Sequence, residues 1–340
     1  MVKVGLIEGD GIGPEITKAT LWVIESLMDK FGLEIEFIKV EAGDECLKRK
    51  GKALPEDTLE VLKDCDAILK GPVGDTAFDV VVKIRQFFDL YANVRPIKTL
   101  PSIPSLKPNI DFIIVRENTE DLYKGFEFYI EDGAIALRII TEKGCRRIAE
   151  YAFKLAENRK KKVVAVHKAN VLRLTDGLFS RICREVASNY KDIDYSEMLV
   201  DAMAMNLIRN PERFDIILTT NLFGDILSDE AAQLVGGLGL APSANIGEKK
   251  ALFEPVHGAA PDIAGKGIAN PLAMILSSKM MLDWFYLYLK KREYEIASRA
   301  LERSVFKALE KGFITPDLGG NKKTLEVAEF IAKDLKVDIT

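Results

Sequence analysis

The chain has 340 residues, of which 48% are hydrophobic and 29% charged, and its formal net charge is −4. This composition suits two ordinary domains or one large one; it excludes a disordered chain and gives no reason to expect nucleic acid or a membrane as partner. Four widely spaced cysteines without zinc-ligand spacing, and a start without a long apolar stretch, lead us to expect reduced thiols and a cytoplasmic location.

Short apolar runs alternate with amphipathic helical patterns along most of the chain. The apolar runs predict strands at 2–7, 35–40, 67–71, 111–116, 162–168 and 214–220. The helical periodicity predicts helices at 15–32, 55–64, 144–162 and 177–190. Such alternation is typical of an α/β fold with a mainly parallel sheet.

Two segments depart from this alternation. Residues 125–141 hold two strand-like runs around Asp132-Gly133, which predicts a hairpin, and we interpret it as an arm that pairs with a second subunit. Residues 271–289 are strongly apolar but interrupted by Lys279 and Asp283, so we expect a buried helix rather than a membrane span.

Charged and polar residues follow several of the predicted strands. Arg116 and Tyr123 follow one strand, His167 and Lys168 end another, and two more arginines, Arg85 and Arg95, come after the strand at 67–71. Ligands of parallel sheets bind beyond the carboxyl ends of the strands, so we expect these side chains to converge on one edge. Arginines suit a small, multiply anionic substrate, although each arginine alone is equally compatible with a surface ion pair.

The stretch NLFGDILSDEAAQLVGG, residues 221–237, follows the strand at 214–220 and has helical spacing. Asp225 and Asp229 lie one turn apart, opposite the apolar stripe. Paired acids at this spacing are usually a solvated face, but they also suit a hard cation such as Mg²⁺. This stretch alone leaves both interpretations open.

Two glycine-rich segments remain. GDGIGPE, residues 9–15, is a poor match to the dinucleotide fingerprint G-x-G-x-x-G, because Pro14 stands where the third glycine of that motif is required. The segment instead predicts a tight strand-to-helix turn. FEPVHGAAPDIAGKGIANP, residues 253–271, is a long loop that contains His257, Asp262 and Asn270. Such loops are often functional, and a packed surface loop is the alternative.

The chain resembles the β-decarboxylating dehydrogenases, the family of 3-isopropylmalate, isocitrate, homoisocitrate and tartrate dehydrogenases. The resemblance covers nearly the whole chain and rests on the motifs GDGIGPE, DLYANVRP, VRENTEDLY, VHKANV, NLFGDILSDEAA and LFEPVHGAAPDIAGKGIANP, in family order. Together these motifs are very specific.

The resemblance implies a role for each matching residue. The carboxylates of a malate-type substrate would be held by Arg85, Arg95 and Arg116. Tyr123 would be the proton donor and Lys168 the general base. A divalent ion, Mg²⁺ or Mn²⁺, would be held by Asp201, Asp225 and Asp229, with Asp201 and Lys168 coming from the partner subunit. The cofactor would be bound by Glu254, His257, Gly258, Asp262, Ile263 and Asn270.

The resemblance also implies an α/β fold of two domains that is not a standard Rossmann fold. Residues 1–90 and 236–340 would form the cofactor-binding domain. Residues 91–235 would form a central domain with a dimerisation arm and the metal-binding helix. The family further implies a homodimer whose active sites are shared between subunits.

Cofactor and substrate preference follow from particular positions. A carboxylate at Asp262 accepts the ribose hydroxyls of NAD and repels the extra phosphate of NADP, so NAD is predicted. Val81 and Val82 suit an isopropyl group, and we expect Asp79 to repel a third carboxylate, which favours 3-isopropylmalate and thus leucine biosynthesis. Homoisocitrate, isocitrate, or a broad range of 3-alkylmalates is the alternative. Outside enzymes, a regulatory subunit or a nucleotide sensor remains, although every matched catalytic position is filled.

Overall fold

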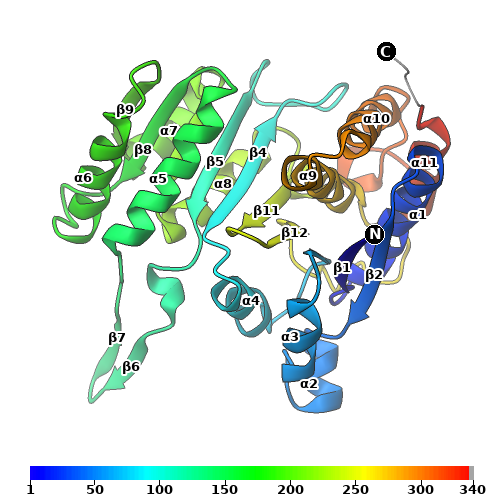
Figure 1. The fold of residues 1–340 in the computed structure, drawn as a ribbon, viewed down its shortest axis with the longest axis horizontal. Helices are drawn as coiled ribbons and strands as arrows, with labels where there is room; N and C mark the ends of the chain where they lie inside the picture. The colour runs from blue at the N-terminus through cyan, green and yellow to red at the C-terminus, as the bar shows by residue number, and fades with distance from the viewer. Residues whose placement is uncertain (337–340) are drawn as a thin grey trace.

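A computed structural model describes residues 1–336 and contains one large sheet of ten strands (Figure 1). Its strand order is β2-β1-β3-β12-β11-β4-β5-β10-β8-β9. The strands are β1 (Val2–Ile7), β2 (Ile35–Val40), β3 (Ala67–Lys70), β4 (Ala92–Lys98), β5 (Asp111–Glu117), β8 (Lys162–His167), β9 (Asp194–Leu199), β10 (Ile216–Thr219), β11 (Pro242–Ile246) and β12 (Ala251–Pro255). All six predicted strands are confirmed, whereas β4, β9, β11 and β12 were not predicted.

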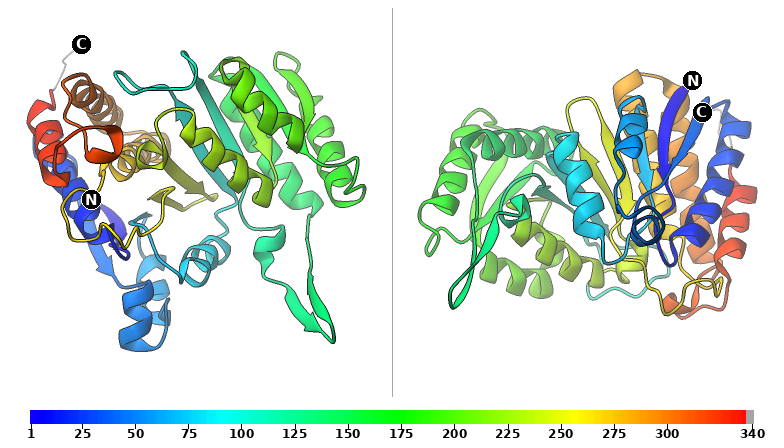
Figure 2. Two further views of the ribbon diagram at one scale, coloured as in Figure 1. Left: turned by 180° about the vertical axis from the view of Figure 1, so that it is seen from behind. Right: turned by 90° about the horizontal axis from the view of Figure 1, so that it is seen from below.

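The helices lie on both faces of this sheet (Figures 1 and 2). They are α1 (Gly13–Phe31), α2 (Asp44–Lys50), α3 (Glu56–Lys63), α4 (Lys83–Phe87), α5 (Glu142–Glu157), α6 (Thr175–Ala187), α7 (Val200–Arg209), α8 (Asn221–Gln233), α9 (Leu272–Leu289), α10 (Arg292–Glu310) and α11 (Thr324–Asp334). The helices predicted at 15–32, 55–64, 144–162 and 177–190 correspond to α1, α3, α5 and α6, and the stretch with helical spacing at 221–237 contains α8. The apolar segment at 271–289 is the buried helix α9, as expected. Among residues 1–336, no helix is both long and apolar enough to cross a membrane.

The continuous apolar runs of the strands are explained by burial on both faces. In β5, Ile113 and Val115 join the core beneath α5, whereas Phe112 and Ile114 join a second core shared with α8. A strand covered by a helix on each side needs apolar residues at every position, which removes the alternation seen in half-exposed strands.

The middle of the sheet reverses direction. β11 runs antiparallel to both β12 and β4, and β4 runs antiparallel to β5, whereas all other pairs are parallel. The carboxyl ends of β3 and β12 therefore lie at the opposite edge from those of β5, β8 and β10. Our expectation that the site residues converge on one edge is wrong for this reason. A site built from residues of both halves of the sheet has to extend across its antiparallel centre.

The predicted hairpin is confirmed as β6 (Glu127–Ile130) and β7 (Gly133–Ala136), which pair only with each other and project from the body (Figure 1). Its apolar side chains are exposed in the single chain, with Tyr129 91% exposed. We propose that this arm pairs with a second subunit. We also propose the division into residues 1–90 with 236–340 and residues 91–235; its boundary falls between β4 and β11, which are neighbours in the one sheet.

Candidate active site

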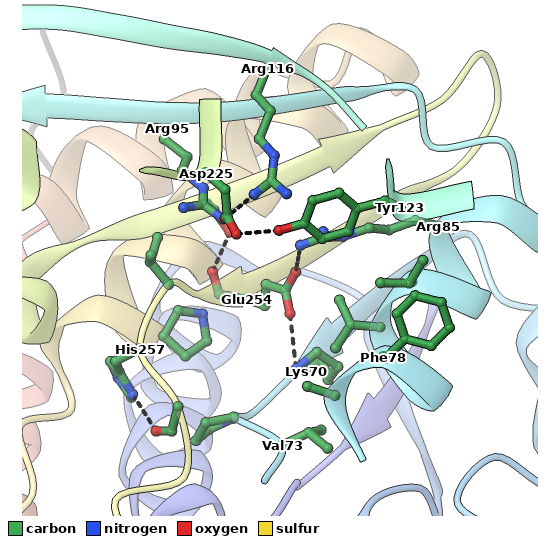
Figure 3. A pocket seen from close by; sticks show the side chains of 18 residues that line it. Lys70, Val73, Phe78, Arg85, Arg95, Arg116, Tyr123, Asp225, Glu254 and His257 are labelled. Carbon is green, nitrogen blue, oxygen red and sulfur yellow. Dashed lines mark hydrogen bonds and ion pairs between the residues drawn. The ribbon is translucent and has the colours of Figure 1, made fainter. Parts of the chain in front are cut away.

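A cavity of about 300 Å³ lies over the antiparallel centre of the sheet (Figure 3). One side is formed by Arg85, Arg95, Arg116, Tyr123 and Asp225. The facing wall is apolar and includes Val73, Ala77, Phe78, Val81 and Val82. The cavity is closed by Lys70, Glu254, Val256, His257 and Gly258. The structure thus joins residues that the sequence separates widely, with a cationic side and an aliphatic side.

Asp225 is the centre of the cationic side. It accepts a hydrogen bond from Arg95 Nη2 at 3.2 Å, one from Tyr123 OH at 2.5 Å, and one from Arg116 Nη1. Burial acts to raise the pKa of this carboxyl, but the charges of Arg116 and Arg95 outweigh it and hold the pKa at about 2. Asp225 is therefore an anion at any physiological pH.

Asp229 lies one turn further along α8 and receives Arg95 Nη1 at 3.1 Å. Burial raises the pKa of Asp229, and the charge of Asp225 adds to this, although Arg95 opposes it. The two acids thus share one arginine, but only Asp225 lines the cavity, whereas the Asp229 side chain is 52% exposed. Carboxylate oxygens at this spacing are ligands that Mg²⁺ and Mn²⁺ accept, so the residues present fit a divalent ion.

Arg85 is held from a second direction by a buried carboxylate. Glu254 accepts from Arg85 Nη2 at 3.0 Å and pairs with Lys70 Nζ at 2.9 Å, and its side chain is only 6% exposed. Burial would raise the pKa of Glu254, but Lys70 and Arg85 lower it to about 2. Glu254, predicted to contact the cofactor, therefore orients Arg85 here, and Lys70 is a cavity residue that sequence reasoning missed.

Two buried polar atoms of cavity residues, Arg85 Nε and His257 Nε2, have no hydrogen-bond partner among residues 1–336. Burial lowers the pKa of His257, and its Nδ1 lies 3.0 Å from the Gly258 carbonyl, which assigns the proton of a neutral ring to Nδ1 and leaves Nε2 as an acceptor. Buried polar atoms are seldom left unpaired without a functional reason.

The apolar wall comes from a π-helical turn, η1 (Phe78–Val82), that leads into α4. Val81 and Val82 line the cavity. Asp79 does not: it is paired with Lys83 Nζ at 2.5 Å on the exposed side of the helix. The expectation that Asp79 repels a third carboxylate is therefore wrong. Asp79 and Lys83 lie one helical turn apart on the exposed side of the helix, where they pair with each other instead of lining the cavity.

Lys168 and Asp201 lie together outside this cavity. Lys168 follows β8, and its Nζ lies 2.6 Å from Asp201 Oδ1 at the start of α7. Within residues 1–336, no group of three histidine, cysteine or acidic side chains is placed to hold a metal ion. Asp225 and Asp229 therefore lack a third carboxylate from the described part of their own chain, and neither Lys168 nor Asp201 is among the residues that line the cavity of the same chain.

The loop after β12 forms a second cavity of about 480 Å³. His257 and Gly258 link it to the first cavity, Ile263 and Asn270 line it, and Asp262 is exposed nearby. Sequence reasoning missed Ile12 and Asp317, which also line it.

The glycine-rich segment at 9–15 supports this loop. Ile12 N donates to Ala259 O at 2.8 Å, and a side chain at Gly11 (φ +57°) would meet that same carbonyl oxygen. Glu15 then accepts hydrogen bonds from the backbone of Gly265 at 3.1 Å and of Ala269 at 3.2 Å. The segment is confirmed as a tight turn that leads into α1, and its glutamate holds the loop from below.

Comparison with known proteins agrees with these features. Residues 3–333 match the family model described as isocitrate/isopropylmalate dehydrogenase. A 3-isopropylmalate dehydrogenase of Saccharolobus solfataricus is 53% identical, with 97% of this chain and 98% of the relative covered. A 3-isopropylmalate/3-methylmalate dehydrogenase of Methanocaldococcus jannaschii is 54% identical, with 99% of each covered.

Among solved structures, an isocitrate dehydrogenase from Methylococcus capsulatus superposes with a TM-score of 0.92 at 43% identity, covering 98% of this chain and 99% of that one. The match in fold therefore extends over nearly the whole chain. The chain belongs to the isocitrate/isopropylmalate dehydrogenase family and is a decarboxylating dehydrogenase.

Proposed function

We propose that this enzyme oxidises and decarboxylates 3-isopropylmalate to 2-oxo-4-methylpentanoate with NAD and a divalent ion, as a step of leucine biosynthesis. The observation that carries the proposal is the cavity itself, where three arginines face an aliphatic wall. Arginine forks suit the two carboxylates of a malate, and Val81 and Val82 suit an isopropyl group. Burying a side group of this size contributes about 1.5–3 kcal/mol.

Mg²⁺ or Mn²⁺ would be held by Asp225 and Asp229 together with Asp201 of the partner subunit. When bound, such an ion acidifies a substrate hydroxyl and polarises the ketone that replaces it. Asp225 is ready for this role because its carboxylate is charged, whereas its present hydrogen bonds come from the arginines that are predicted to bind substrate. Substrate carboxylates would share these same N–H groups.

The chain's own residues account for the proton transfers. Lys168 of the partner subunit would take the proton of the substrate hydroxyl, while the carbon that bears this hydroxyl would give a hydride to NAD. The resulting β-keto acid loses CO₂, and Tyr123 would then protonate the carbon that carried it. Burial raises the pKa of Tyr123, although Arg116 opposes this, so the phenol keeps its proton at neutral pH and is available as a donor.

The NAD adenosine would occupy the second cavity, contacting Ile263 and Asn270, with Asp262 at the ribose hydroxyls. The nicotinamide would then extend past His257 and Gly258, which line both cavities. A carboxylate at position 262 disfavours the additional phosphate of NADP by charge repulsion. NAD is therefore the proposed cofactor.

A homodimer with shared sites completes the proposal. Lys168 and Asp201 are close to each other but outside the cavity of their own chain. For the proposed roles, they have to reach the cavity of a partner subunit. The exposed arm at 127–136 and the exposed apolar side chains Met205 and Ile208 of α7 are the surfaces we assign to this contact.

A second substrate class is favoured by one observation. Lys70, whose position in the cavity was not predicted, supplies a cation beside the aliphatic wall, and a third carboxylate of isocitrate or homoisocitrate would need one. Its pairing with Glu254 neutralises that charge, which is why we place 3-isopropylmalate first. A smaller side group, as in 3-methylmalate, also fits a wall of valines.

NADH formation with a panel of substrates tests the proposed function. We expect the highest kcat/KM with 3-isopropylmalate, a preference for NAD over NADP, loss of turnover with EDTA and recovery with Mn²⁺ or Mg²⁺. Preference for isocitrate or homoisocitrate would replace the substrate proposal by the alternative. No turnover with any of these substrates would favour a regulatory subunit.

Replacing Glu15 by glutamine is expected to weaken NAD binding selectively. The amide loses the charge that holds the backbone N–H groups of Gly265 and Ala269, and hydrogen bonds to a charged group contribute about 1.5–3 kcal/mol. We expect KM for NAD to rise roughly tenfold while kcat changes little. The matched control is Glu25→Gln, an exposed glutamate of the same helix. Equal effects of both variants on KM would contradict a role for Glu15 in the loop.

A further inference from the structure

A buried ionic cluster at the base of the arm connects three segments of the site. We propose that Arg138 is a positioning residue: its one guanidinium fixes the turn that carries Tyr123, the turn that carries Lys168 and the start of helix α8. This inference rests on the proposed roles of those residues, but the contacts themselves do not. Arg138 lies two residues beyond β7, and its side chain is 13% exposed.

The first branch leads to Tyr123. Arg138 Nε donates to Asp121 Oδ1 at 2.6 Å, and Nη2 donates to Oδ2 at 3.2 Å, which makes a two-pronged contact. Asp121 is fully buried and has φ +67°, a backbone conformation that residues other than glycine rarely adopt. Its carboxylate also accepts from Leu122 N at 2.9 Å. Arg138 thus stabilises a strained turn that places Tyr123, two residues further on, against Asp225.

The second branch leads to Lys168. Arg138 Nη1 donates to Asp176 Oδ1, and the other oxygen of that carboxylate accepts from the backbone N–H of Lys168 at 2.5 Å. Asp176 is fully buried at the start of α6. One carboxylate therefore joins the guanidinium to the backbone from which the proposed base projects, and Lys168 is fixed at its main chain while its amine remains with Asp201.

The third branch leads to the metal-binding helix. Arg138 Nη2 donates to Thr220 Oγ1 at 2.9 Å, at the residue before α8, and the guanidinium lies 5.1 Å from the ring of Phe223. Asp121 Oδ2 accepts from Leu222 N in the first turn of α8 at 3.2 Å. The start of the helix that presents Asp225 is therefore held by both members of the Arg138–Asp121 pair.

Charge and shape both make arginine specific here. Asp121 and Asp176 are two buried carboxylates, and Arg138 is the cation that contacts both. Removing a buried cation leaves its anions uncompensated, and lysine keeps the charge but loses the planar fork that reaches several partners at once. Because Arg138 lies at the base of the arm that we assign to the subunit contact, this one side chain connects the arm to the site.

The chain contains a matched arginine for comparison. Arg159 donates from Nε to the buried Asp215 at 2.8 Å and from Nη2 to Asp111 at 2.7 Å. It therefore also bridges two carboxylates of the β5–β10 region, but at the amino ends of these strands, far along the sheet from Arg116 and Thr219 at their carboxyl ends. A purely structural role predicts a loss of stability in both variants but no selective loss of kcat in either.

The experiment compares Arg138→Lys with Arg159→Lys in the full chain. Both variants are expected to lower Tm by a few degrees. Arg138→Lys is expected to reduce kcat roughly 10- to 100-fold, with KM for NAD nearly unchanged, because displaced catalytic groups affect turnover more than cofactor binding. Arg159→Lys is expected to leave kcat within about twofold. Equal kcat for the two variants, with an active parent enzyme, overturns the inference.

Backbone hydrogen exchange supplies a readout that needs no activity. In Arg138→Lys, exchange is expected to rise in all three segments, 119–124, 168–172 and 220–226, whereas Arg159→Lys leaves them unchanged. A second variant, Asp176→Asn, should raise exchange mainly at 168–172, because it breaks only that branch. A rise confined to the arm overturns the inference. If the parent enzyme turns over none of the tested substrates, the proposed function fails, and the exchange pattern still decides the positioning role.

Discussion

Replacing Lys168 by methionine is expected to lower kcat by roughly 10²- to 10⁴-fold, the range contributed by a positioned general base. Methionine keeps the length and much of the apolar stem but cannot take the hydroxyl proton. Lys168 is outside the cavity that holds its own chain's Arg85 and Asp225, so the defect should appear in kcat while NAD affinity, measured by fluorescence or calorimetry, stays near that of the parent.

The control for this variant is Lys162→Met. Lys162 is an exposed lysine that begins strand β8, whereas Lys168 follows the end of the same strand. We expect Lys162→Met to retain kcat, since it is remote from both cavities. Retention of activity by Lys168→Met would remove it from the chemistry, and a parallel loss of NAD affinity would indicate a folding defect instead.

The parts of the fold that the sequence predicts well are those determined by local burial. Strands β1 and β2 have the predicted bounds because every core position of these short runs is apolar and flanked by turns. Strand β4 was missed because Asn93, Arg95 and Pro96 interrupt its apolar pattern; of these, Arg95 lines the cavity and Asn93 accepts a hydrogen bond from Arg95 Nε at 2.8 Å. Local pattern fails where function replaces packing.

The direction of strand pairing is not encoded in periodicity. A strand with both faces covered has the same composition whether its neighbour is parallel or antiparallel, so the reversal through β11 and β4 could not be inferred from apolar runs. The consequence was the wrong expectation of one common edge. The residues that gather at the cavity were nevertheless predicted, because motif resemblance does not depend on the pairing.

Contacts between charged residues on different elements were the second feature that the sequence did not predict. Glu254 with Lys70, and Arg138 with Asp121 and Asp176, join buried partners that lie far apart in the sequence or on different elements. In the sequence, none of these residues differs from an ordinary exposed charged residue. Only their burial in the folded chain distinguishes them. Asp79 shows the reverse error, since the sequence places it beside the pocket residues Val81 and Val82, but its side chain is paired with Lys83.

Replacing Asp225 by asparagine is expected to reduce kcat roughly 10³-fold, comparable to removing a principal electrostatic group of an active site. The amide is neutral, and its NH₂ cannot accept from Arg95, Arg116 and Tyr123 as the carboxylate does. Mn²⁺ affinity, measured by calorimetry in the presence of substrate, should fall in parallel. Since arginine holds the pKa of Asp225 near 2, lowering the pH to 5 should not reproduce this defect.

The control is Asp283→Asn, an acid on helix α9 that pairs with Lys279 at 2.9 Å outside the site. It also loses one carboxylate from a helix surface, and we expect kcat and Mn²⁺ affinity to remain close to the parent values. If Asp225→Asn binds Mn²⁺ as tightly as this control does, Asp225 is not a metal ligand, and its place in the arginine cluster serves substrate binding alone.

Mixing Asp225→Asn with Lys168→Met subunits tests whether the sites are shared. If Lys168 serves the partner's cavity, a mixed dimer places both defects in one site and leaves the other intact. Random reassembly then makes about half of the dimers mixed, each with one working site of two, so about a quarter of the parent activity should return. If each cavity used its own Lys168, every site in the mixed dimer would carry one defect. Continued inactivity after mixing, with subunit exchange verified by mass spectrometry, would therefore show that each chain works alone.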